Sequence, residues 1–189
     1  MNSLLTHELK NAFSGILAVL LGKKNAGDYF DLGLRGLAGS LVVFLIAAAF
    51  NAYLPGIIAT GTELSADAPP PPTAAMALFL VTIVYIFQSA FGAIALNQFK
   101  KLDGLVPYLV VSNWATFFFT GLFAALRLVG LNGFPFLLLM ATMLIVSEIN
   151  ILRLVIGLKF AQIAMFIIAQ FIGALGGLMI FWIINPSQI

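Results

Sequence analysis

The sequence predicts an all-α membrane protein, a polytopic helical bundle of five transmembrane helices preceded by an N-terminal amphipathic helix. Of its 189 residues, 62% are hydrophobic and only 8% are charged, whereas soluble domains carry about 25% charged residues. The charges also leave long uncharged stretches, for example between Arg35 and Glu63 and after Lys159. A surface with so little charge must be covered by lipid. The chain reads as one membrane domain over residues 1–189.

The first 27 residues form a cytoplasmic amphipathic segment in this scheme, and the helix is expected over residues 1–22. Apolar residues recur at helical spacing on one side, namely Leu5, Leu9, Phe13, Ile16 and Leu20. Polar residues fall on the other side, namely His7, Lys10, Asn11 and Ser14. Two compatible interpretations follow. The helix lies along the headgroups with Lys23 and Lys24 near anionic lipid, or it packs on the cytoplasmic face of the protein. No convincing cleavage site follows, so we expect this segment to be retained.

The five-span bundle occupies residues 28–185. The expected spans are residues 33–54, 74–97, 105–129, 134–155 and 159–184. Each has at least about 20 residues, enough at a rise of 1.5 Å per residue to cross a hydrocarbon layer of about 30 Å. Asp28 and Asp31 suit the start of the first span, and Pro55 with Gly56 predicts its end.

Loop lengths and basic residues set the topology. Short loops after the second, third and fourth spans make consecutive helices antiparallel neighbours. The long loop, residues 56–73, holds the run Pro69 to Pro72, which we interpret as a polyproline II spacer, with a docking ligand as the alternative. Eight of the nine Lys and Arg residues fall on one side of the membrane in this topology, and only Arg127 falls on the other side. This predicts a cytoplasmic N-terminus and a periplasmic C-terminus.

Polar residues at membrane depth predict a layer centred on Glu148 in the cytoplasmic half. The candidates are Glu148, Asn113, Ser147, Asn150, Gln88, Ser89 and Ser40. The functional interpretation is a proton or cation site in which Glu148 titrates or coordinates. The structural interpretation is an interhelical hydrogen-bond cluster, with Glu148 protonated or paired with Asn113, Trp114 or Arg153. Both interpretations stay open from the sequence.

Small residues mark a candidate helix-packing face on the fifth span. Ala169, Gly173 and Gly177 recur at a spacing of four, which allows a second helix to approach closely, within the chain or in a dimer. Gln170 beside them needs a polar partner. Tyr53, Tyr108 and Trp182 lie near expected span ends and suit the aromatic belts at the membrane interfaces.

The sequence contains no pattern that indicates an enzyme. The single histidine, His7, lies outside the spans, and the chain has no cysteine. No metal-ligand spacing, nucleophile elbow, P-loop or dinucleotide-binding glycine pattern is found. We therefore expect no catalytic residues, no metal and no cofactor. No basic face or aromatic motif indicates nucleic acid as a partner.

Several short segments resemble an uncharacterised family of inner-membrane proteins from alphaproteobacteria. These segments are residues 30–32 with Gly36 and Ser40, residues 99–114, and residues 149–164 with Arg153 and Gly157. The layout over about residues 28–185 resembles bacterial Yip1-like proteins, with a cytoplasmic N-terminal segment followed by five spans. The resemblance implies membrane organisation or an accessory role and supplies no catalytic residues.

These observations lead to one expected function and one alternative. We expect a non-enzymatic inner-membrane protein, an accessory or scaffold subunit or a membrane-organising protein, whose partners are the lipid bilayer and another protein or a second copy of the chain. The alternative is a small transporter or channel that uses the polar layer around Glu148.

Overall fold

The computed structural model describes residues 2–59 and 73–185, and within these ranges the chain is helical and contains no strand. This confirms the all-α prediction. The first helix, α1, runs from Asn2 to Leu20. Five further helices are long and apolar enough to cross a membrane. They are α2 (Leu34–Ala59), α3 (Ala74–Gln98), α4 (Leu105–Leu128), α5 (Gly133–Asn150) and α6 (Phe160–Ile184).

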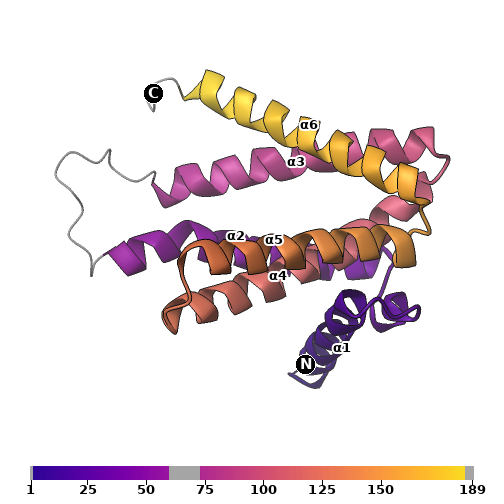
Figure 1. Ribbon diagram of the computed structural model, residues 1–189, viewed down its shortest axis with the longest axis horizontal. Helices are drawn as coiled ribbons and strands as arrows, with labels where there is room; N and C mark the ends of the chain where they lie inside the picture. Colours follow the sequence, from indigo (N-terminus) through magenta and orange to yellow (C-terminus); the bar gives the residue numbers. More distant parts are fainter. Residues whose placement is uncertain (1, 60–72, 186–189) are drawn as a thin grey trace.

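The five long helices form two groups (Figure 1). α3 packs along α6, and α2 packs along α4 with α5 beside it. The groups meet near the short segments that carry Lys100, Lys101 and Lys159, which we call the basic end, and they diverge toward the opposite end. Asn51 of α2 donates a hydrogen bond to the hydroxyl of Thr120 on α4 at 3.1 Å. The α3–α6 pair and the α2–α4–α5 group are therefore the two units of the bundle.

Glycines let α6 lie close to α3. A Cβ atom added at Gly173 would lie 2.7 Å from the carbonyl oxygen of Phe87, and one at Gly177 would lie 3.0 Å from the Cα of Val84. Ala169 is half-buried against the apolar core. The small-residue face expected from the sequence is thus used within the chain, and its use in a dimer stays a prediction.

The N-terminal helix α1 packs on α4 and α5 and on the short 3-10 helix η1 (Ala26–Tyr29). Ala12, Ile16 and Val19 are buried on this side. The chain then enters α2 through a turn in which the Asp31 carboxylate accepts a hydrogen bond from the backbone N–H of Gly33 at 3.0 Å. Packing of α1 on the bundle, one of its two sequence interpretations, is therefore observed.

Two helix boundaries differ from the sequence expectation. α2 continues past Pro55 and Gly56 to Ala59, because a membrane helix tolerates one lost N–H donor better than it tolerates unpaired backbone groups in lipid. The expected loop therefore begins inside this helix, and its proline run lies outside the described residues. The fourth span ends in a π-helical turn, η3 (Ile151–Val155), where a regular α-helix was expected.

Candidate functional site

The central feature is a hydrogen-bonded chain of three side chains across the two helix groups. The hydroxyl of Tyr108, in the first turn of α4, donates to Oε1 of Glu148, near the end of α5, at 2.9 Å. The side-chain amide of Gln170, in the middle of α6, donates to the same hydroxyl at 2.7 Å. Tyr108 is 4% exposed. This chain links the α3–α6 pair to the α2–α4–α5 group.

The position of Tyr108 corrects the expectation that it belongs to an interfacial aromatic belt. Its ring is buried and packs edge-on against Phe166 of α6, with ring centroids 5.0 Å apart. A tyrosine one turn into a span can point inward as well as along the interface, and here the partly buried carboxylate of Glu148 supplies the partner that its hydroxyl needs.

A second polar contact joins α2 to α4. Asn113 donates to the hydroxyl of Ser40 at 3.1 Å, and Ser40 donates to the carbonyl of Leu37 at 2.9 Å. Asn113 is 1% exposed and Ser40 is fully buried. Two residues of the expected layer are thus bonded to each other, in a contact separate from the one at Glu148.

A third polar contact ties α1 to the bundle at the basic end. Asn150 donates to the backbone carbonyl of Val19 at 2.8 Å, and it accepts from Arg153 at 3.2 Å. Ser147 bonds only its own helix, donating to the carbonyl of Leu144 at 2.9 Å. Arg153 was one of the residues expected to pair with Glu148. In the structure its hydrogen bond goes to Asn150 instead.

Two cavities lie beside the hydrogen-bonded chain that links the two helix groups, one lined by Tyr108 and the other by Glu148. The first, the Tyr85 cavity, has a volume of about 370 Å³ and lies between α2, α3, α4 and α6. Gln88 and Ser89 line this cavity. They face the same interior as Glu148 but form no hydrogen bond with it. The Tyr85 hydroxyl is buried and has no hydrogen-bond partner among the described residues.

The second cavity, the Glu148 cavity, has a volume of about 480 Å³ and lies between α4, α5 and α6. Ser147 and Glu148 line it from α5. Ser112, Thr116 and Gln170 line both cavities. The two cavities thus adjoin each other through shared polar side chains, and Glu148 supplies the one carboxylate that lines them.

The chemistry available at this site is limited to one acidic group. Over residues 2–59 and 73–185, no three His, Asp or Glu side chains gather to hold a metal ion. One carboxylate with surrounding hydroxyl and amide groups can hold a proton or a single monovalent cation.

Sequence reasoning identified Glu148 and noted that Gln170 needs a partner, but it missed Tyr85 and placed Tyr108 wrongly. A spacing signal was available. Tyr108, Ser112 and Thr116 recur at intervals of four, which places them on one face of α4. Tyr85 and Ser89 do the same on α3.

The fold and this interior define a multi-pass helical membrane protein with a buried polar site. No protein-family model, curated protein or solved structure matches the chain.

Proposed function

We propose that this chain is a non-enzymatic bacterial inner-membrane protein, an accessory or scaffold subunit or a membrane-organising protein of the Yip1-like type, with a cytoplasmic N-terminus. The observation that carries this proposal is the outer face of α1. That face gives the helix an apolar surface in addition to the one that packs on the bundle.

The outer face of α1 is an exposed apolar stripe. Its members are Leu9, Phe13 and Leu17, between 42% and 50% exposed, and Leu21 in the turn that follows the helix is 69% exposed. They recur at a spacing of four, so they share one side of the helix. The adjacent side, with Ala12, Ile16 and Val19, is buried on the bundle. The apolar surface of α1 is therefore wider than bundle packing requires.

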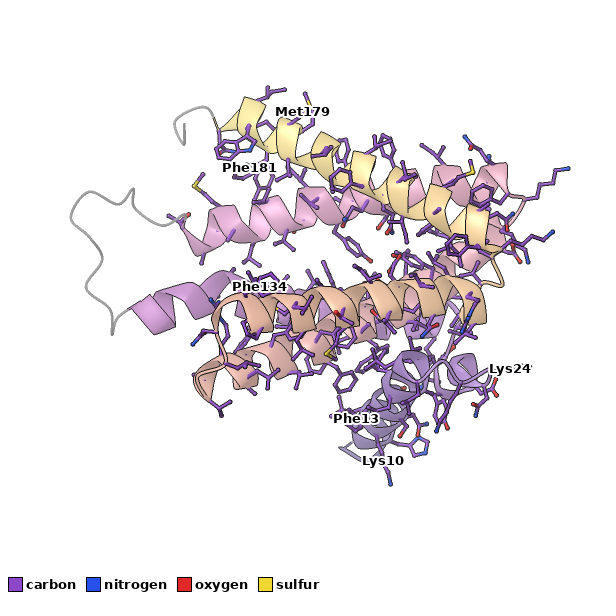
Figure 2. The ribbon with its side chains drawn as sticks, in the orientation of Figure 1. Lys10, Phe13, Lys24, Phe134, Met179 and Phe181 are labelled. Atoms are coloured by element: carbon purple, nitrogen blue, oxygen red, sulfur yellow. The ribbon has the colours of Figure 1, made fainter. Side chains whose placement is uncertain are left out.

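The location of α1 supports contact with acyl chains. The ring of Phe13 packs edge-on against Phe118 of α4, with centroids 5.5 Å apart. Phe118 comes 13 residues after Leu105, which is about 20 Å along α4 at 1.5 Å per residue. Phe13 thus lies at the edge of the outer face, next to the bundle, and Figure 2 shows Lys10 extending away from the bundle and Lys24 at the basic end. Such a helix can lie in one leaflet with its lysines at anionic headgroups.

Vesicle shape tests this role. The full chain is reconstituted into vesicles that contain anionic lipid, and vesicle diameter is measured by electron cryomicroscopy. Insertion of an apolar wedge into one leaflet should yield smaller or tubulated vesicles. The double variant Leu9→Ser, Leu17→Ser should lose this effect, and the matched control Leu9→Ile, Leu17→Ile should keep it. Equal remodelling by the serine variant would contradict the proposal.

Partner association tests the accessory or scaffold role. The chain is purified in mild detergent and its mass is measured under native conditions. We expect a second copy of the chain or a co-purifying membrane protein. A monodisperse monomer that carries no other protein would count against this role.

The second candidate function is transport of protons or cations. The specific observation in its favour is the position of Glu148, which bonds Tyr108 between two helix groups and lines an interior cavity. Proteoliposomes with an internal pH indicator or cation indicator test this function. If Glu148→Gln folds normally and leaves a measured flux unchanged, transport through this site is excluded.

A further inference from the structure

We propose that the Tyr85 cavity is hydrated and gives a proton one-sided access to Glu148, from the end of the bundle opposite the basic end, with Tyr108 as the relay. This inference deepens the second candidate function and rests on it for its biological use. It makes a separate claim, however, because access and proton binding can be measured without any flux.

The cavity extends along the bundle. Leu80 of α3 and Leu178 of α6 line its far part. At the basic end, α3 ends at Gln98 and α6 begins at Phe160, so each leucine lies 18 residues from that end of its helix. This is about 27 Å at 1.5 Å per residue. Tyr108 also lines the cavity and lies only about 5 Å from the start of α4. The cavity therefore covers about 20 Å of the bundle length.

The cavity wall is mostly apolar, but polar groups along it offer hydrogen-bond partners to water. Seven side chains with polar groups line it in addition to Tyr108, namely Tyr85, Gln88, Ser89, Ser112, Asn113, Thr116 and Gln170. The buried Tyr85 hydroxyl has Asn113 and Ser89 as neighbours but forms no hydrogen bond of good geometry among the described residues, and a buried hydroxyl without a partner is unfavourable. A volume of about 370 Å³ has room for roughly a dozen water molecules at about 30 Å³ each.

The basic end closes the site. The turn that follows Glu148 carries Ile151, Leu152 and Ile156, which are between 0% and 6% exposed, and Leu158 beyond it is also buried. These residues belong to the main apolar core. Water in the Tyr85 cavity can therefore reach Tyr108, which is bonded to Glu148, but meets a packed apolar layer from the basic end.

The relay follows from the hydrogen-bond directions. Tyr108 donates its proton to Oε1 of Glu148, and Gln170 occupies one lone pair of the Tyr108 oxygen. The second lone pair can accept a proton from hydronium in the cavity. As that O–H bond forms, the original Tyr108 proton passes to Oε1. Hydronium and carboxylate become water and carboxylic acid. The other titratable side chains that line the two cavities are Tyr85 and Tyr108, and no Lys, Arg or His lines either.

Cysteine labelling tests the access route. The chain has no cysteine, so each single-cysteine variant has a silent background. Ser89→Cys reports the cavity, and Ile86→Cys, on the lipid-facing side of α3 and 56% exposed, is the matched control. In oriented proteoliposomes, a charged methanethiosulfonate reagent should label Ser89→Cys severalfold faster than the control, and only from the end opposite the basic end. Labelling no faster than the control, or equal from both sides, would overturn the proposal.

Infrared spectroscopy tests the relay. A pH jump should produce a carboxyl band that Glu148→Gln removes. Tyr108→Phe should slow the appearance of this band severalfold, while Tyr53→Phe, an exposed position, should not. Each variant is checked by its melting temperature. An unchanged rate in a folded Tyr108→Phe protein would disprove the relay. Labelling and protonation without flux would instead exclude only the transport function.

Discussion

Replacing Gly173 with alanine tests whether the close contact between α3 and α6 holds the bundle together. The added Cβ would lie 2.7 Å from the carbonyl oxygen of Phe87, a backbone atom that cannot rotate away. Overpacking of this kind costs about 1–3 kcal/mol. Alanine is favoured over glycine in a helix by about 0.5–1 kcal/mol, which offsets part of the cost.

Gly121→Ala is the matched control, because Gly121 also lies inside a helix and a Cβ added there meets nothing within 4 Å. It should leave stability unchanged or raise it by up to about 1 kcal/mol. We therefore expect the two variants to differ by about 1–3 kcal/mol in the free energy of unfolding. Denaturation of the purified protein in mixed micelles, followed by circular dichroism, measures this difference. Equal stability of Gly173→Ala and Gly121→Ala would refute the packing argument.

Three further substitutions test the polar contacts, with unfolding in mixed micelles as the common measurement for the first two. Asn113→Ala leaves the buried Ser40 hydroxyl without its donor and should cost about 1–3 kcal/mol, and an unchanged stability would show that the contact is dispensable. Tyr108→Phe removes the hydroxyl that joins the two helix groups and should also cost about 1–3 kcal/mol. Asn150→Ala frees the carbonyl of Val19, so α1 should detach more often and trypsin should cut sooner between α1 and α2. Wild-type cleavage rates would contradict this.

The number of long helices follows from local features of the sequence. Each apolar run is bounded by charges or turn residues, and a run of about 20 residues must close its own hydrogen bonds in lipid. Pro55 shows the limit of such local rules. In water a proline often ends a helix, but α2 continues to Ala59, because the cost of the free backbone groups depends on the surroundings.

The candidate site was predictable as a set of residues but not as a set of bonds. Glu148, Asn113 and Asn150 were recognisable because polar groups are unusual at membrane depth. Their hydrogen bonds join residues 40, 73 and 131 positions apart in the chain, and no local pattern specifies such pairings. Tyr108 was misjudged for the same reason, since its place one turn into α4 suits an interface as well as the interior.

By itself, the sequence determined the all-α class, the five membrane-length helices, the amphipathic N-terminal helix and the residues that bring polarity into the bundle. These properties depend on composition and on spacing within single segments. Only the tertiary structure decided that Glu148 meets Tyr108 and Gln170, that α3 pairs with α6, and that α1 divides its apolar surface between the bundle and its outer face. These outcomes depend on how helices distant in the sequence pack, which is a property of the whole chain.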